Sequence, residues 1–388
     1  MALISLSNPS TARAEAAQKS MTTKIASVLQ QNRSPLVSFR VLMMTGAASD
    51  PKGREGVAAL TAAMLAGGGS RAMTYEQIVE AMYPMASSFG SQIDKEMTVF
   101  TGTTHVENLE RYYALISQML LDPGFREEDF TRLKADQINF LKTTLRESND
   151  EELGKEYLYN IIYAGHPYAH HNAGTVSSLE KLTLDDVRAF YRANYTQGNL
   201  VLGLAGGYTP DFLKKVEADF AKLPAGKADR QQFAAPKVDP GARVEIVQRE
   251  TRATAISMGF PIGVTRADRD WAALAVVASY FGQHRSSNSY LYQKLREARG
   301  LNYGDYAYIE YFPRGMFQFT PDANLGRRQQ IFQIWIRPVE PQNGVFALRA
   351  ALYEYDKLVR DRMSKEAFEG TRAFLTKYTN ILTQTQDE

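Results

Sequence analysis

The chain repeats one pattern of elements on either side of a polar segment. Residues 223–242 are rich in Pro, Gly and charged side chains, which predicts an interdomain linker. Before the linker, a strand-like stretch at 38–45 is followed by turn residues and an apolar helix that begins Val-Ala-Ala-Leu at 57–60. After the linker, a strand-like stretch at 255–263 is followed by a charged turn and an apolar helix that begins Trp-Ala-Ala-Leu at 271–274. The repetition predicts a duplicated α+β unit.

The domain boundaries follow from this repeat. We expect a first domain over residues 35–222, a linker over 223–242 and a second domain over 243–388. Residues 1–34 are expected to be a tail or the remnant of a signal peptide. The chain ends inside or just after an expected helix at 365–382, which suggests that the second domain is truncated.

Length, charge and cysteine content narrow the class of protein. The chain has 388 residues, enough for two or more domains with separate cores. Its net charge of +2 gives no bias towards nucleic acid, and no apolar run approaches the length that spans a bilayer. With no Cys, the chain forms no disulfide and offers neither a thiolate nucleophile nor a sulfur ligand. We therefore expect no nucleic-acid partner and no membrane span.

The first residues favour export. Residues 1–6 form a short apolar patch, and residues 12–16 place small side chains at alternate positions, as at the end of a secretory signal. A basic leader is missing. The prediction is a periplasmic or otherwise exported protein, with a flexible tail on a cytoplasmic protein as the alternative.

The stretch Tyr290–Tyr303 carries the candidate functional residues. It predicts a helix that ends at Gly300, a residue suited to the left-handed conformation just past a helix end, and then a strand. Arg296 is always protonated and Tyr303 has a phenolic donor, so the two side chains together could hold a carbonyl or an oxyanion. The alternative is an exposed Arg and a half-buried strand Tyr without a chemical role.

The run Leu295–Tyr303 resembles the Arg/Tyr motif in the C-terminal half of the pitrilysin/insulinase family of zinc metallopeptidases. The resemblance covers residues 35–377 and includes the helix and strand between 182 and 224. It implies an α+β fold of two homologous domains, each a mostly antiparallel sheet with helices packed on one face.

The zinc site of that family is absent from this sequence. Active members carry His-x-x-Glu-His on a helix that follows a Gly-containing turn, where the two His bind zinc and the Glu is the general base. Here the corresponding positions are Ala59, Ala62 and Ala63, and alanine has no lone pair to offer. The third ligand of the family, a Glu, would fall within residues 139–142, which contain no carboxylate. We expect no metal on this chain.

A replacement metal site is an alternative. His166, His170 and His171 lie within six residues, and His is a common zinc ligand. Pro167 breaks any helix that would align them, and no Glu stands at the spacing of a general base. A structural turn is the favoured interpretation.

The resemblance implies a division of labour that is known in two-chain members of the family. This chain would be the non-catalytic subunit of a heterodimeric zinc metallopeptidase and no peptidase alone. A related partner would carry the zinc, and Arg296 and Tyr303 would bind the peptide substrate and its transition state. The alternative function is a purely structural or binding subunit of the core-protein type.

Overall fold

The computed structural model describes residues 25–226, 233–238, 241–311 and 326–382. The first half is built on a sheet in the order β1-β5-β2-β4-β3. Strand β1 runs parallel to β5, and the other neighbours are antiparallel. The strands are β1 (Ala26–Gln31), β2 (Leu36–Met43), β3 (Ser88–Ile93), β4 (Thr98–His105) and β5 (Leu200–Gly206).

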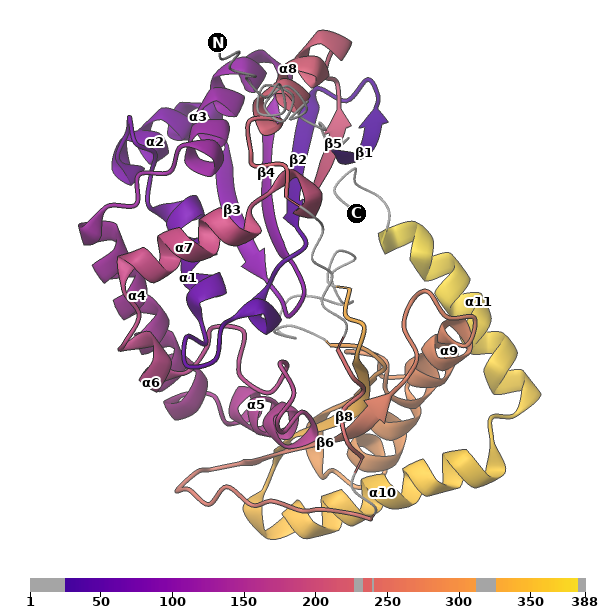
Figure 1. The fold of residues 1–388 in the computed structure, drawn as a ribbon. Coiled ribbons are helices and arrows are strands. Elements are labelled where there is room, and N and C mark those ends of the chain that lie inside the picture. The colour runs from indigo at the N-terminus through magenta and orange to yellow at the C-terminus, as the bar shows by residue number, and fades with distance from the viewer. Residues whose placement is uncertain (1–24, 227–232, 239–240, 312–325, 383–388) are drawn as a thin grey trace, which may run out of the picture.

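Every second side chain of β2 points towards the helices that cover one face of the sheet. Val37, Phe39, Val41 and Met43 are buried and face the helices, where the Phe39 ring contacts the rings of two Tyr residues of α3. The helices lie on one face of the sheet (Figure 1). They are α1 (Val57–Gly67), α2 (Tyr75–Met82), α3 (Leu109–Leu121), α4 (Glu127–Asn139), α6 (Val176–Leu179), α7 (Leu184–Asn194) and α8 (Pro210–Phe220).

The second half repeats this design with a smaller sheet. Its described strands are antiparallel in the order β6-β8-β7. A separate core lies between this sheet and its helices and includes Phe281, Leu295 and Ile334. The elements are β6 (Thr254–Ile262), α9 (Trp271–Gly282), β7 (Asn302–Tyr308), β8 (Gln330–Val339), α10 (Gly344–Asp361) and α11 (Lys365–Leu382). The predicted fold class, two α+β domains with mostly antiparallel sheets, is confirmed.

Helix α5 (Asp150–Ile162) joins the two halves in space. It comes before the linker in the sequence, but it packs on the face of the second sheet that α9 and α10 leave open (Figure 1). The Lys155 ammonium lies 3.6 Å from the centre of the Trp335 ring on β8. A methyl group added at Gly154 would come within 3.2 Å of Ser257 Oγ on β6, so the helix and the strand are in close contact.

Three local features differ from the sequence-based expectation. Strand β1 lies inside the stretch 1–34 that was expected to be a tail, and it forms an edge of the first sheet. The sequence predicts one amphipathic helix over 126–147, but helix α4 is followed by a π-helical segment, η5 (Phe140–Glu147). The helix expected before Gly300 likewise contains a π-helical segment, η7 (Tyr292–Glu297). The described residues between 223 and 253 contain no helix or strand, so the irregular segment runs past the expected end of the linker.

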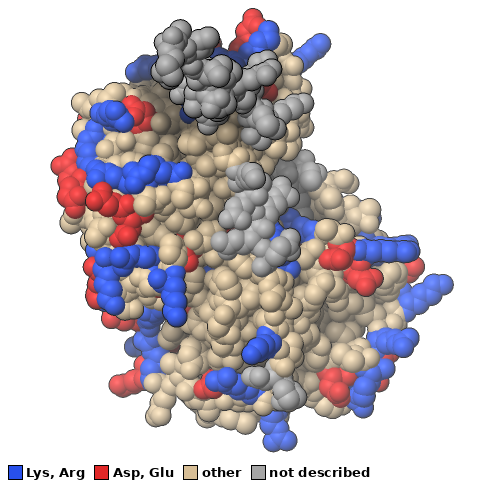
Figure 2. All heavy atoms as spheres, in the orientation of Figure 1, with Lys and Arg blue, Asp and Glu red and all other residues tan. Residues whose placement is uncertain are grey.

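Some predictions lie outside the described residues. These concern residues 315–320, for which the sequence predicts a strand, and residues 1–6 and 12–16, which favoured export. Within the described parts, no helix is both long and apolar enough to cross a membrane. On the face shown in Figure 2, basic and acidic side chains are mixed around the margins, as the small net charge requires.

Candidate functional site

The junction between η7 and β7 brings the two predicted site residues together. Gly300 has φ +63°, the left-handed conformation that the sequence predicted, and it lets the chain turn back towards the sheet. The N–H of Gly300 donates to the carbonyl of Arg296 at 2.7 Å. Leu295 and Leu301, on either side of the turn, are buried in the core of the second half and anchor it.

The guanidinium of Arg296 lies between two aromatic rings. Its central carbon is 4.3 Å from the centre of the Tyr303 ring and 4.7 Å from that of Tyr292. Its Nη1 also donates to the backbone carbonyl of Tyr303 at 3.0 Å. These contacts fix the direction of the planar cation, while the Tyr303 side chain remains 64% exposed. Sequence reasoning found Arg296 and Tyr303 but not Tyr292.

A buried carboxyl group lies beside this pair and was also missed. Asp305 is 1% exposed, and Asn302 Nδ2 donates to its Oδ1 at 2.7 Å. Within the described parts of the chain its Oδ2 has no hydrogen-bond partner. Burial raises the pKa of Asp305 to about 7, although the Asn302 hydrogen bond and the charge of Arg296 act in the opposite direction. The alternation of β7 could have placed Asp305 on the core side.

The three alanines occupy one part of helix α1. Ala59 and Ala62 are buried and Ala63 is partly exposed. The segment 139–142 follows the neighbouring helix α4, where Leu141 is fully buried in the same core. Methyl and isobutyl groups therefore stand where a metal centre would need lone pairs.

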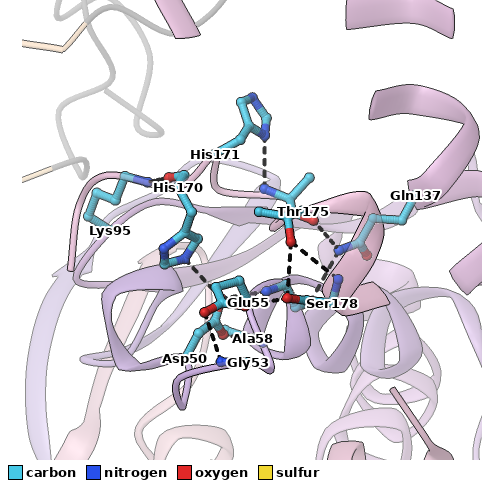
Figure 3. A network of polar contacts seen from close by, with 12 residues as sticks. Asp50, Gly53, Glu55, Ala58, Lys95, Gln137, His170, His171, Thr175 and Ser178 are labelled. Atoms are coloured by element: carbon cyan, nitrogen blue, oxygen red, sulfur yellow. Dashed lines mark hydrogen bonds and ion pairs between the residues drawn. The ribbon is translucent and has the colours of Figure 1, made fainter. Parts of the chain in front are cut away.

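The start of helix α1 is held by a buried carboxylate. Asp50 accepts hydrogen bonds from the N–H groups of Gly56 and Ala58 at 2.6 and 2.8 Å, which satisfies backbone donors of the first helical turn. His170 Nε2 donates to the same carboxylate at 3.1 Å (Figure 3). Burial raises the pKa of Asp50, against the effect of the hydrogen bond from His170.

The three clustered histidines make separate contacts. His170 reaches Asp50, whereas the His171 ring points away from it and accepts the N–H of Ala173 at 3.0 Å (Figure 3). His166 Nε2 donates to the carbonyl of Ala234 at 3.0 Å. Over the described ranges, no group of three or more His, Cys, Asp or Glu side chains is arranged to hold a metal ion.

An open groove of about 890 Å³ lies over the side of the first sheet that its helices leave uncovered. Its lining comes from β2, β4 and β3, and β3 is the last of the described strands in the sheet order. Small and polar side chains line most of it, among them Ser88, Gln92 and Thr101. Strand β3 ends at Ile93, and the next residues, Asp94 and Lys95, are buried.

The turn after β3 is bound to the second half. Asp94 and Arg327 form a two-point ion pair in which both side chains are almost fully buried, with Arg327 Nε 2.7 Å from Asp94 Oδ2. The opposite charge of Arg327 keeps the pKa of Asp94 low in spite of burial. Next to it, Glu96 accepts hydrogen bonds from the Tyr168 hydroxyl and from the Arg328 backbone.

Comparisons with known proteins agree with this arrangement. Two family models match the chain, one described as "Peptidase M16 inactive domain" over residues 181–375 and one as "Insulinase (Peptidase family M16)" over residues 26–176. An uncharacterized zinc protease of Streptomyces coelicolor is 27% identical over 252 residues, which cover 63% of this chain and 53% of that protein. The chain spans about half to two thirds of the length of two of the curated relatives that it matches.

Solved structures show the same fold. The M16 inactive domain from Pseudomonas fluorescens superimposes with a TM-score of 0.79 at 22% identity, covering 93% of this chain and 81% of that one. A chain of Complex III2 from Candida albicans superimposes with a TM-score of 0.71 at 16% identity, covering 91% and 78%. The family model over the second half, together with the one over the first, confirms the resemblance drawn from the Arg296 region. The chain therefore belongs to the M16, or insulinase, peptidase family as an inactive member.

Proposed function

We propose that this chain is the non-catalytic subunit of a two-chain zinc metallopeptidase. It supplies Arg296 and Tyr303 to a site whose zinc ion and general base lie on a related partner chain. The observation that carries the proposal is the fixed Arg296 guanidinium, stacked between two rings at an exposed turn, in a chain with alanine at the three zinc-motif positions.

The geometry of Arg296 suits a substrate oxygen. Its contact with the Tyr303 carbonyl uses one of the five N–H groups of the guanidinium. The described part of the chain offers those groups no other hydrogen-bond acceptor. A fixed cation with remaining donors can hold a peptide carbonyl, and it binds more strongly once negative charge develops on that oxygen.

The exposure of the pair is a reason to expect a partner. Tyr303 is 64% exposed, and charge interactions in water are strongly weakened by the high dielectric constant. Donors of this kind stabilise a transition state well only where water is excluded. A second chain that covers the η7–β7 turn would provide that exclusion.

The peptide would lie extended in the shared chamber. Among the described strands β3 has a neighbour on one side alone, and the groove beside it is lined by Gly90 and small polar side chains. An extended peptide can pair with such an edge through its backbone, largely independently of its sequence. Peptides are therefore the proposed substrate class.

The test begins with the partner and then measures activity. The tagged chain is isolated from its native extract, and the co-eluting polypeptide is sequenced for His-x-x-Glu-His. The purified pair is then assayed on a fluorogenic peptide with wild-type chain and with Arg296→Ala. We expect the variant to lower kcat by about 10²- to 10³-fold while the pair stays assembled, since removal of one preorganised donor has this effect.

A matched control separates this role from general effects of charge. Arg360 is an exposed arginine on α10, paired with Asp356, and Arg360→Ala should leave turnover unchanged. A chain that elutes alone contradicts the two-chain proposal. If a pair forms but Arg296→Ala together with Tyr303→Phe leaves turnover unchanged, the chain is a structural or binding subunit of the core-protein type.

A further inference from the structure

A small cavity lies where the two halves meet, away from the η7–β7 turn. Its wall is formed by helix α5, the end of η5, the turn after β3, the loop at 169–172, Tyr311, and Arg327 and Trp335 before and within β8. The cavity has a volume of about 50 Å³. A single water molecule needs about 10 to 15 Å³ by this measure, so the space fits three or four atoms larger than hydrogen.

The wall contains three donor groups with hydrogens that lack acceptors among the described residues, together with the carboxylates of Glu152 and Glu156. Lys95 is 3% exposed, and its ammonium donates to the carbonyl of His170, which leaves two of its three hydrogens (Figure 3). Among the residues that the structure describes, the Tyr159 hydroxyl and Arg327 Nη1 are buried without a hydrogen-bond partner. Both residues line the cavity, and the Arg327 guanidinium lies 5.5 Å from the Tyr159 ring. One acceptor, Asn172 Oδ1, also lacks a partner there.

The charges around the cavity leave Lys95 without a direct counter-ion. Arg327 is neutralised by Asp94, Lys155 pairs with Glu151 and Glu152, both at 2.7 Å, and Glu156 of the wall pairs with Arg146 at 2.8 Å. Within the described ranges, the acceptor that the Lys95 ammonium contacts is a backbone carbonyl, that of His170. Burial, and then the nearby Arg327, lower the pKa of Lys95 to about 7, so a bound anion would restore its charge.

We propose that this cavity is a binding site for a small carboxylate about the size of acetate. The oxygens of the anion accept hydrogens from Lys95, Tyr159 and Arg327, and its charge pairs with the Lys95 ammonium. Burying an ammonium group without a counter-ion is costly, and the Tyr159 hydroxyl and Arg327 Nη1 have no acceptor among the described residues, so the site selects an anion over a neutral molecule of the same size.

The turn that carries Lys95 is rigid enough to form such a site. The N–H groups of Ala47 and Ala48 donate to the carbonyls of Asp94 and Lys95 at 2.9 and 2.8 Å. A Cβ at Gly46 would lie 2.2 Å from the Asp94 carbonyl oxygen, so the close approach of the two segments requires glycine there. The Lys95 backbone is therefore held in place before any ligand binds.

Calorimetric titration with sodium acetate tests the proposal, at pH about 6.5 and at an ionic strength held constant with sodium chloride. The full chain should bind one equivalent of acetate, and Lys95→Met should abolish binding. Tyr159→Phe should weaken it about tenfold, the usual effect of losing one hydrogen bond to a charged group. Lys52→Met, at an exposed lysine, is the matched control and should bind like wild type. Benzoate, which is larger than the cavity, should not compete.

The outcomes are distinct. If acetate produces no saturable heat and no shift of the melting temperature, the cavity holds water only and the proposal is wrong. Equal affinity in wild type and Lys95→Met would place the binding elsewhere and would also overturn it. Should Lys95→Met fail to fold, Tyr159→Phe still decides, because the hydroxyl it removes has no partner in the free protein and its loss should not lower stability.

Discussion

Asp94 and Arg327 lie 233 residues apart in the sequence and form a buried two-point ion pair between the two halves of the molecule. Each side chain is at most 1% exposed. Because a lone charge is very costly in such surroundings, each residue requires the other. The pair therefore makes the contact between the halves specific.

Removing one member of this pair should strongly destabilise the protein. Asp94→Asn leaves the Arg327 charge buried without its counter-ion, and we expect a loss of about 3 to 5 kcal/mol in the free energy of unfolding. Urea denaturation of wild type and variant measures this difference in the free energy of unfolding. The control Asp356→Asn breaks an exposed pair with Arg360 and should cost less than about 1 kcal/mol.

The double variant Asp94→Asn, Arg327→Met sharpens this prediction. With both charges gone, no uncompensated charge remains, so the double variant should be more stable than Asp94→Asn alone. Additive losses from the two single variants would show that the two residues act independently.

Because of Asp305, the free energy of unfolding should fall as the pH rises. Its pKa is raised to about 7 in the folded protein, mainly by burial, from about 3.9 in the unfolded chain. Between these two pKa values the folded state holds a proton that the unfolded state has lost. The contribution of the protonated Asp305 to the free energy of unfolding is therefore complete below pH about 4 and is lost as the pH rises through about 7. Asp305→Asn removes this dependence.

Denaturation at two pH values measures the effect. One pH unit between the two pKa values is worth about 1.4 kcal/mol, so at pH 8 we expect Asp305→Asn to be a few kcal/mol more stable than wild type. At pH about 4 the two should be equal. The exposed Asp211→Asn is the control and should show neither effect. If the free energy of unfolding depends on pH in the same way in wild type and Asp305→Asn, the raised pKa of Asp305 is contradicted.

Tyr292 should act as a positioning residue for Arg296 in the assembled peptidase. Its ring covers one face of the guanidinium, a contact worth about 0.5 to 1 kcal/mol at an exposed position. Tyr292→Ala should therefore reduce kcat by about two- to fivefold. Tyr292→Phe keeps the ring and should restore full turnover, whereas a purely structural role for the hydroxyl would make the two variants equally slow.

Acetate binding in the cavity should weaken as Lys95 loses its proton. With a pKa of about 7, the ammonium form dominates below that pH, and the affinity should fall about tenfold for each pH unit above it. Titrations from pH 6 to 9 measure this, and an affinity that stays constant over that range contradicts the assignment. The ionisable and charged groups around Lys95 and its cavity are Asp94, Arg327, Asp50, His170 and Glu156, together with Glu152, Lys155, Tyr159, His171 and Tyr311 of the cavity wall.

Local chemistry in the sequence predicted several elements well. Gly300 adopts the left-handed conformation expected at a helix end. A Thr followed by acidic residues, as at 183–186, is typical of a helix start, and Thr183 caps α7 through the N–H of Asp186. These features depend on a few neighbouring residues, which is why one sequence is enough to predict them. The meeting of Arg296 and Tyr303 follows from the same short turn.

Other features depend on residues far apart and could not be predicted. Strand β1 is exposed on both faces, so it lacks the alternation of a half-buried strand, and only its parallel pairing with β5 defines it. The π-helical turn η7 contains helix-forming residues, and no periodicity distinguishes it from an α-helix. In the sequence, Lys95 and Arg327 look like ordinary surface residues, because their burial depends on contacts between the two halves.

Helix α5 belongs to the first half of the sequence but packs against the sheet of the second half. Glu151 on this helix pairs with Arg337 of β8 at 2.7 Å, and Asp150 accepts a hydrogen bond from Thr251 at 2.8 Å. A protease that cuts between residues 226 and 252 would therefore nick the polypeptide without releasing either fragment. The linker is therefore not needed to hold the two fragments together, and after cleavage they should elute from a size-exclusion column as one complex.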